Sequence, residues 1–137
     1  MQGSSTAGSA PTVLIAEDEF LLAVEIEELV RGIGCRVVGP AADISELLAL
    51  IDGTRCDLAL LDVQLRHGET VYAVADRLRA LGVPYVFMTA YGEAGIDPRY
   101  ADASVVCKPF SEAQIKSCLS TLVRSKSRQA NDVFDQL

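Results

Sequence analysis

The stretch Leu58-Ala59-Leu60-Leu61 is a short apolar run in which no polar residue alternates with the apolar ones. A strand that is apolar on both faces must be covered on both faces, as the central strand of a parallel sheet is. Four more short apolar runs lie along the chain, separated by segments with apolar residues three and four apart. This alternation predicts an α/β fold with a doubly wound, five-stranded parallel sheet. The strands are expected at residues 12–16, 36–40, 58–61, 85–88 and 103–107.

Capping residues mark the beginnings of two of the intervening helices. Asp43 is followed three residues later by Glu46, and Ser111 is followed three residues later by Gln114. Side chains with this spacing satisfy the free backbone N–H groups at a helix N-terminus. Pro98 lacks a backbone donor, so the helix expected around it should be short or irregular.

The length and charge of the chain limit what it can do. Its 137 residues suffice for one domain that buries a single core without disulfides. Acidic residues outnumber Lys and Arg by 19 to 12, which gives a net charge of -7. Binding to a phosphate backbone requires clustered Lys and Arg. Direct binding of nucleic acid is therefore not expected, and a cation is the better candidate ligand.

Composition also indicates where the domain begins and ends. Residues 1–11 are expected to be a flexible leader, residues 12–124 the folded domain and residues 125–137 a polar tail. The leader lacks the basic start and apolar core of a signal peptide, and no apolar run reaches the roughly 20 residues of a membrane span. The sequence therefore predicts a cytoplasmic protein. Its cysteines form no C-x-x-C pair and are expected to be reduced and buried: Cys35, Cys56, Cys107 and Cys118.

Three consecutive carboxylates, Glu17-Asp18-Glu19, follow the first apolar run directly. Neighbouring carboxylates repel one another and resist ionisation unless a positive charge neutralises them. They are compatible with a solvated loop, in which Asp18 or Glu19 would cap the following helix, or with a metal site.

Polar residues also follow the other predicted strands. Asp62 comes after the third strand, Thr89 after the fourth, and Lys108-Pro109 after the fifth. In an open parallel sheet, reactive groups lie beyond the carboxyl ends of the strands. Carboxylate oxygens there suit Mg²⁺, which takes one or two protein carboxylates and shares its other positions with water and phosphate. A divalent ion is therefore expected against the acids that follow the first strand.

Four motifs occur in order along the chain: Ala16-Glu17-Asp18-Glu19, Leu60-Leu61-Asp62-Val63, Met88-Thr89-Ala90 and Cys107-Lys108-Pro109-Phe110. They resemble, in the same order, the acidic pocket, phosphoacceptor strand, switch strand and Lys-Pro motif of a response regulator receiver domain of a two-component system. The chain is most similar to the stand-alone, single-domain type, over residues 12–124. The resemblance implies a flavodoxin-like (βα)5 fold with strand order 2-1-3-4-5.

The resemblance implies that Asp62 is a nucleophile. It would accept a phosphoryl group from a phosphohistidine, while Thr89 and Lys108 contact the phosphoryl oxygens. The Lys108–Pro109 peptide would be cis. The phosphoryl group would draw Thr89 inward and change the neighbouring protein-binding surface, which is a two-state switch.

The resemblance also implies a metal site with Mg²⁺ as cofactor, or Mn²⁺ as an alternative. Asp18, Asp62 and the backbone carbonyl of Gln64 would hold the ion, and Glu17 would reach it through water. The ion would offset the charge of bringing the acceptor and the phosphoryl group together.

Some positions differ from the family pattern. The family usually has an aromatic residue three positions before the lysine, where this chain has Val105, and Tyr91 is expected to take part of its role. A subgroup of stand-alone receivers has a Phe-x-Thr strand and no such aromatic residue, as in Phe87-Met88-Thr89, although its following Gly is Ala90 here. The lone histidine, His67, is expected at the surface. The positions expected to modulate the chemistry are Gln64, Ala90, Tyr91, Val105 and Pro109.

Several functions are compatible with these residues. The leading hypothesis is a phosphoacceptor signalling module that is not an enzyme beyond slow autodephosphorylation. Alternatives within the family are a phosphate shuttle or sink, the receiver fragment of a longer regulator, or a degenerate scaffold. A hydrolase that turns over through an aspartyl phosphate would need a second acid two residues after Asp62, where the chain has Gln64.

The expected partners are proteins. A sensor histidine kinase or a histidine phosphotransfer protein would supply the phosphoryl group, and a downstream protein would bind the switched surface. Neither a membrane nor nucleic acid is expected as a direct partner, and a homodimer is an open alternative.

Overall fold

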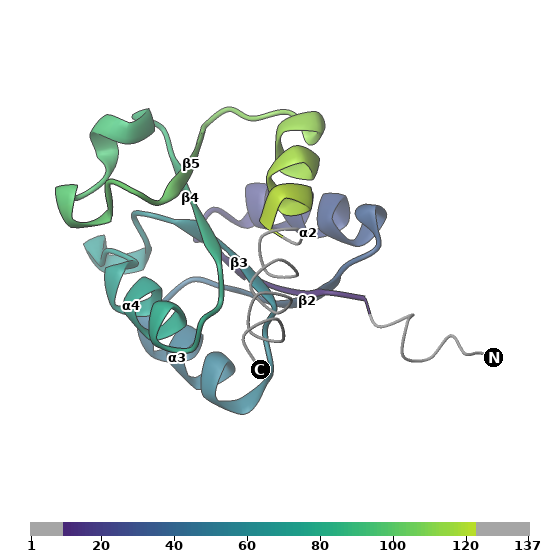
Figure 1. The fold of residues 1–137 in the computed structure, drawn as a ribbon, viewed down its shortest axis with the longest axis horizontal. Coiled ribbons are helices and arrows are strands. Elements are labelled where there is room, and N and C mark those ends of the chain that lie inside the picture. Colours follow the sequence, from purple (N-terminus) through teal and green to yellow (C-terminus); the bar gives the residue numbers. More distant parts are fainter. Residues whose placement is uncertain (1–9, 123–137) are drawn as a thin grey trace, which may run out of the picture.

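A five-stranded parallel sheet forms the centre of the molecule in the computed structural model, which describes residues 10–122 (Figure 1). The strands lie in the order β2-β1-β3-β4-β5, and every neighbouring pair is parallel. The predicted fold class and strand order are therefore confirmed. The strands are β1 (Thr12–Ala16), β2 (Arg36–Ala41), β3 (Leu58–Asp62), β4 (Tyr85–Thr89) and β5 (Ser104–Cys107).

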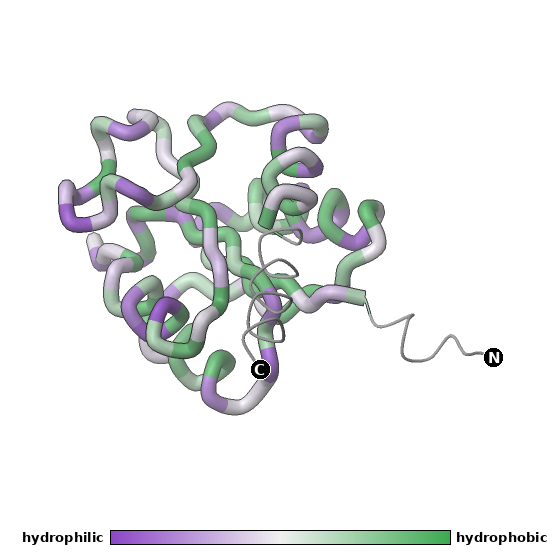
Figure 2. Tube along the Cα trace, viewed as in Figure 1, coloured by the Kyte–Doolittle hydropathy of each residue, from purple (hydrophilic) through white to green (hydrophobic). Residues whose placement is uncertain are grey.

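The central strand β3 is buried over its whole length. Because successive side chains of a strand point to opposite faces, Leu58 and Leu60 belong to one core cluster and Ala59 and Leu61 to the other. Hydrophobic residues accordingly concentrate in the strands at the centre of the molecule (Figure 2). An apolar run without polar alternation thus predicts correctly that both faces are covered.

Helices cover both faces of the sheet. α2 (Phe20–Ile33) and the helix at residues 112–122 pack on one face, and α3 (Ile44–Gly53) and α4 (Tyr72–Ala80) pack on the other. The two faces hold separate apolar clusters, so the sheet divides the core into two layers.

Both predicted helix caps are present. The Asp43 carboxylate accepts the Glu46 N–H at 2.8 Å at the start of α3. At the start of the last described helix, the Ser111 hydroxyl accepts the Gln114 N–H at 3.1 Å, and the Gln114 side-chain oxygen accepts the Ser111 N–H at 2.7 Å. These bonds satisfy backbone donors that a helix leaves free at its N-terminus.

Two short 3₁₀ turns, η2 (Gly92–Gly95) and η3 (Pro98–Tyr100), connect β4 to β5 in place of an α-helix. The predicted irregularity around Pro98 is therefore confirmed. The ring of Tyr100 stacks on that of Tyr72 in α4 with 4.7 Å between centroids, and the Tyr72 hydroxyl accepts the Asp97 N–H at 2.7 Å. The second turn is thus attached to α4.

The cysteines correct one expectation. All four are free, but only Cys56 is buried, while Cys35 and Cys118 are half-buried and Cys107 is exposed. Cys107 ends β5, an edge strand with a neighbour on one side only. No described helix is long and apolar enough to cross a membrane. Most of the predicted leader (1–9) and the whole predicted tail (125–137) lie outside the described residues.

Candidate functional site

Four of the predicted site residues meet at the carboxyl edge of the sheet. Glu17 follows β1, Asp62 ends β3, Thr89 ends β4 and Lys108 follows β5. Glu17, Asp62 and Thr89 are 3%, 7% and 5% exposed, and they are the buried polar residues of the described chain. Parallel strands present their carboxyl ends at one edge, so four residues far apart in sequence become neighbours.

The acids form a cluster at this edge. One carboxylate oxygen from each of Glu17, Asp18 and Asp62 lies within 4.8 Å of the others. Glu17 and Asp62 are buried, whereas Asp18 is exposed. Glu19 has a different role, because it occupies the N-cap position of α2 without a side-chain capping bond and donates its N–H to Glu17 Oε2 at 3.2 Å. The alternative in which these acids only cap the helix is therefore not supported.

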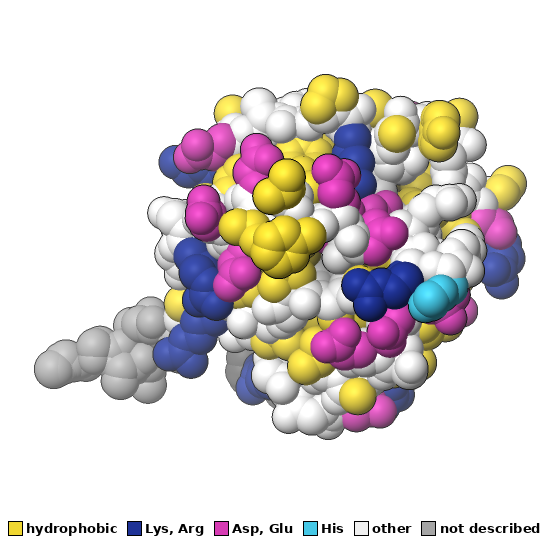
Figure 3. Space-filling view, turned by 180° about the vertical axis from the view of Figure 1, so that it is seen from behind, with side chains coloured by type: hydrophobic (Ala, Val, Ile, Leu, Met, Phe, Trp, Pro, Cys, Tyr) yellow, Lys and Arg dark blue, Asp and Glu magenta, His cyan; other side chains and the backbone are white. Residues whose placement is uncertain are grey.

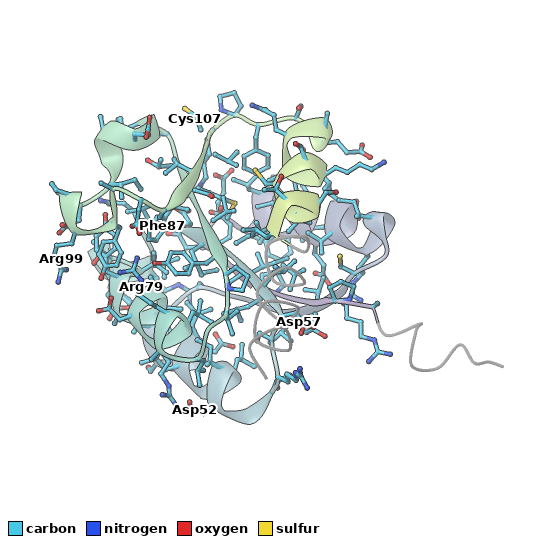
Figure 4. All side chains as sticks on the ribbon, in the orientation of Figure 1. Asp52, Asp57, Arg79, Phe87, Arg99 and Cys107 are labelled. Atoms are coloured by element: carbon cyan, nitrogen blue, oxygen red, sulfur yellow. The ribbon has the colours of Figure 1, made fainter. Side chains whose placement is uncertain are left out.

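Lys108 connects the two buried carboxylates. Its Nζ donates to Asp62 Oδ2 at 2.8 Å and to Glu17 Oε1 at 3.1 Å. Burial alone would lower the pKa of the Lys108 ammonium, but the hydrogen bond and charge of Asp62, followed by those of Glu17, raise it. In Figure 4, Cys107, the residue before Lys108, marks this edge, while Asp57 lies at the opposite end of β3. The site thus contains a charged ammonium at any physiological pH.

The Glu17 carboxyl resists ionisation. Burial, the hydrogen bond with Asp62 and the Asp62 charge raise the pKa of Glu17 from 4.5 to about 7, although Lys108 acts in the opposite direction. A single ammonium therefore does not fully compensate the negative charge of the cluster. Burial and neighbouring like charge are the ordinary causes of such a shift.

The residues fit a small divalent cation. The cluster offers carboxylate oxygens from three side chains, which are hard ligands of the kind that Mg²⁺ binds. The uncompensated charge would be relieved by a second positive group, and the exposed Asp18 leaves a route for it from solvent. The structure therefore supports an acidic, cation-compatible pocket at the predicted position.

The loop after β3 turns back over Asp62. Asp62 Oδ1 accepts the Gln64 N–H at 3.2 Å. Gln64 is exposed and pairs with Thr70 in an antiparallel arrangement of the backbone. His67 is exposed as predicted, and its backbone is left-handed at φ 64°. Gln64 therefore lies beside the acid cluster, whereas its assignment as a carbonyl ligand stays a prediction.

The Thr89 hydroxyl is held by the loop that follows it. Thr89 Oγ1 accepts the Tyr91 N–H at 3.1 Å, and the Tyr91 side chain is 75% exposed. Ala90, between them, is also exposed. On the neighbouring strand, Val105 is half-buried against the core cluster that contains Phe87. The Lys108 N–H donates to the Thr89 carbonyl at 2.8 Å, which joins the two strand ends.

The Lys108–Pro109 peptide is cis, as predicted. One residue near the site escaped the sequence analysis: Gly95, at the end of η2, lies so close to Thr89 that a Cβ atom on it would be 2.6 Å from Thr89 Oγ1. The only signal in the sequence is a glycine six residues after the threonine. A glycine in a loop has many explanations, so this signal was not sufficient.

Comparison with known proteins identifies relatives. The family model of the response regulator receiver domain matches residues 13–120. The phyllosphere-induced regulator PhyR of Methylorubrum extorquens is 37% identical over 117 residues, which cover 83% of this chain and 44% of that protein. The chain spans about half the length of the curated relatives it matches.

Solved structures agree with this match. The solution structure of SdrG from Sphingomonas melonis has a TM-score of 0.75 at 33% identity and covers 84% of this chain and 98% of that one. The crystal structure of the anti-anti-sigma factor PhyR from Bartonella quintana has a TM-score of 0.80 at 30% identity and covers 90% of this chain and 51% of that one.

Proposed function

This chain belongs to the response regulator receiver domain family, and from that premise we propose that Asp62 is the phosphoacceptor of a two-component pathway or phosphorelay. Receiver domains are signalling modules, and the chain is one of them. The observation that carries the proposal is the pair of Asp62 and Lys108. A carboxylate at the end of a buried strand lies 2.8 Å from an ammonium and within reach of two further acids.

The transfer exchanges one bond to phosphorus for another. A carboxylate oxygen of Asp62 attacks the phosphorus of a phosphohistidine, the P–N bond breaks, and an aspartyl P–O bond forms. The imidazole leaves as a neutral ring when its other nitrogen carries a proton beforehand. The Lys108 ammonium, already bonded to Asp62, then donates to a phosphoryl oxygen without moving far. The module carries phosphate stoichiometrically and is not an enzyme beyond slow autodephosphorylation.

Mg²⁺, or Mn²⁺ in its place, supplies the positive charge that this step needs when it is bound. The proposed ligands are Asp18, Asp62 and the backbone carbonyl of Gln64, with Glu17 acting through water. The proximity of the three carboxylates and the raised pKa of Glu17 support this assignment. Asp18 is exposed, so it contributes an accessible oxygen on the solvent side.

Thr89 completes the proposed site, because its hydroxyl donates a hydrogen bond to a phosphoryl oxygen. Its Oγ1 accepts a hydrogen bond from Tyr91, so the hydroxyl hydrogen stays available for donation. Around it, Gln64, Ala90 and Tyr91 flank the entrance and modulate hydrolysis. Val105 and Pro109 shape the neighbouring strand end, through which the change reaches a downstream protein.

A docking surface for the phosphodonor protein lies on α2. Phe20 and Leu21 are largely exposed there, and a groove lined by Phe20 and Val24 also contains Glu17 and Asp18. Figure 3 shows such exposed hydrophobic side chains bordered by acidic ones. An apolar patch next to the acceptor favours a protein donor, a sensor histidine kinase or a histidine phosphotransfer protein. We place this exchange in the cytoplasm, without direct contact to a membrane or nucleic acid.

A second candidate is the receiver portion of a longer regulator. The observation in its favour is that the chain covers 44% of the M. extorquens relative. In that case the switched surface contacts an attached effector in place of a separate protein, and the chemistry at Asp62 is unchanged.

Intact-mass measurement after incubation with Mg²⁺ and acetyl phosphate tests the proposal. The protein should gain one phosphoryl group, and the gain should disappear in Asp62→Asn and in the presence of a chelator. Asp57→Asn is the matched control, because Asp57 lies at the other end of the same strand and binds the Thr12 N–H. An undiminished gain in Asp62→Asn, or none in the wild type with any donor, overturns the proposal.

A further inference from the structure

The turn η2 lies directly against the side chain of Thr89. A Cβ atom on Gly95 would lie 2.6 Å from Thr89 Oγ1 and 3.1 Å from the Cβ of Tyr91. Real Cβ atoms essentially never approach another atom within 3.0 Å. The space that a side chain at position 95 would need is therefore taken by the Thr89 hydroxyl.

The two glycines of this turn are favoured for different reasons. Gly92 has a left-handed backbone at φ 59°, and a Cβ atom there would meet nothing within 4 Å. Gly95 is not among the residues with a positive φ, so its backbone conformation is open to other residues. Glycine is favoured at position 92 by backbone conformation and at position 95 by contact with Thr89.

The hydroxyl that occupies this space is hydrogen-bonded to the start of the turn. Thr89 is 5% exposed, and its Oγ1 accepts the Tyr91 N–H. Within the described part of the chain, the hydroxyl hydrogen-bonds this loop and not Asp62 or Lys108. Donation to a group on Asp62 is therefore expected to draw the hydroxyl away from the space beside Gly95.

We propose that Gly95 is a positioning residue that holds space for the Thr89 hydroxyl in the unphosphorylated state. When the hydroxyl moves toward the phosphoryl group, it vacates that space and releases the Tyr91 N–H, and the η2 turn becomes free to move. This inference rests on the proposed function for its trigger. The contact between Gly95 and Thr89 is a property of the unphosphorylated protein and can be tested there.

The test is a double-mutant cycle between positions 95 and 89. Gly95→Ala inserts a methyl group where the hydroxyl lies, so the hydroxyl should be displaced without phosphorylation. The amide resonance of Tyr91, measured by ¹H–¹⁵N NMR, should then move in the direction that Mg²⁺ with beryllofluoride produces in the wild type. In a Thr89→Ala background, which lacks Oγ1, Gly95→Ala should move this resonance much less, because only the 3.1 Å contact with the Cβ of Tyr91 then remains.

Gly92→Ala is the matched control in the same turn. It strains a left-handed position without touching Thr89, so its effect on the Tyr91 resonance should be the same in both backgrounds. If Gly95→Ala only disturbed the turn, its effect on the Tyr91 resonance would likewise be the same in both backgrounds. Equal shifts for Gly95→Ala with and without the Thr89 hydroxyl overturn the proposal.

Stability provides a second measurement if Gly95→Ala does not fold. Removal of Oγ1 should then rescue folding, so the double variant Thr89→Ala/Gly95→Ala should be folded, and a double variant that is also unfolded overturns the proposal. The cycle uses unphosphorylated protein throughout. If beryllofluoride and acetyl phosphate have no effect on the wild type, the proposed function fails, while the coupling between positions 89 and 95 is still measured independently.

Discussion

The two halves of the carboxyl edge are built differently. Glu17 follows β1 and Asp62 ends β3, and both strands are almost entirely buried and paired on both sides. Thr89 ends β4, which is as buried as β1 and also paired on both sides, and Lys108 follows the edge strand β5, where Ser104 and Cys107 are exposed. The first half is the acid half and the second is the switch half. The two halves thus differ at the edge strand β5, and the proposed carboxylate ligands lie on the half whose strands are both paired on two sides.

The connection after β4 also differs from the others. α2 follows β1, and a 3₁₀ turn (Arg66–Gly68) and α4 follow β3, whereas two 3₁₀ turns without an α-helix connect β4 to β5. Only the second of these turns is attached to α4, by the stacked rings of Tyr72 and Tyr100. The first turn, η2, contacts Thr89 and has no such aromatic attachment among the described rings. Motion in the switch half is therefore expected between residues 91 and 95.

The largest expected effect is on stability in the core beneath the two halves. Leu61 of β3 is fully buried, and Val105 of β5 is half-buried against the same cluster. Leu61→Ala should lower the free energy of unfolding by about 3 to 4 kcal/mol and Val105→Ala by about 1 kcal/mol. Urea denaturation with unchanged slopes checks both values. Similar losses at the two sites would remove the distinction between the halves.

A smaller effect is expected from pH in the acid half. The pKa of Glu17 is about 7 in the folded protein and 4.5 in the reference state. The folded state therefore holds the proton more tightly, so stability that is present below pH 4.5 is lost as pH rises to about 7. The loss in metal-free protein should be about 2 to 3 kcal/mol. Denaturation in chelator across this pH range measures it, and Mg²⁺ at pH 8 should restore stability.

Variants in the two halves test whether Glu17 causes this pH dependence of stability. Glu17→Gln removes the titrating group, so the free energy of unfolding should no longer fall between pH 4.5 and 7. Thr89→Val, in the switch half, should leave the slope unchanged. A slope that persists in Glu17→Gln assigns the proton to another residue.

Lys108 of the switch half hydrogen-bonds both buried carboxylates of the acid half. Its removal should therefore weaken the coupling between phosphorylation of Asp62 and the switched state. Lys108→Ala should still gain a phosphoryl group by intact mass, because Asp62 and the acid cluster are retained. The population of the switched state should fall about tenfold, equivalent to about 1.4 kcal/mol, as measured by the amide shifts of Tyr91 and Gly92 with Mg²⁺ and beryllofluoride. Lys116→Ala, on the exposed face of the last described helix, is the control. Full shifts in Lys108→Ala would contradict the coupling.

The smallest free-energy effect is expected at Tyr91. Its side chain is 75% exposed, so Tyr91→Ala should change stability by no more than about 0.5 kcal/mol. Tyr91 is bonded to Thr89 through its N–H, so under the proposed function loss of its ring should nevertheless admit water and shorten the lifetime of the phosphoryl group several-fold. The decay of phosphorylated protein by mass gives this lifetime, with Leu81→Ala as an exposed control at the end of α4. An unchanged lifetime would remove Tyr91 from the modulating positions.

Sequence patterns predicted the acid half well because its features are local. The run Leu58-Ala59-Leu60-Leu61 lacks polar alternation, and this pattern follows directly from burial on both faces. The strand boundaries agree to within one residue, and each polar residue at a strand end appears at the expected edge. The caps at Asp43 and Ser111 were equally predictable, since both partners lie within four residues.

The switch half was predicted less completely because its contacts are not periodic. The closeness of Gly95 to Thr89 depends on the path of a 3₁₀ turn, and no spacing rule specifies that path. The exposure of Cys107 depends on β5 being the edge strand, which an apolar composition does not reveal. The second bond of Lys108, to Glu17, joins residues 91 positions apart and was likewise not expected.

The exposure of Asp18 has a consequence for how a cation would reach the proposed site. Two of the carboxylates lie beneath the surface and the third faces solvent, so an ion could arrive or depart without any opening of the protein. The slow step would then be the loss of water molecules by the ion itself, which Mg²⁺ gives up reluctantly. Under the proposed function, occupancy of the unphosphorylated site would follow the surrounding magnesium concentration.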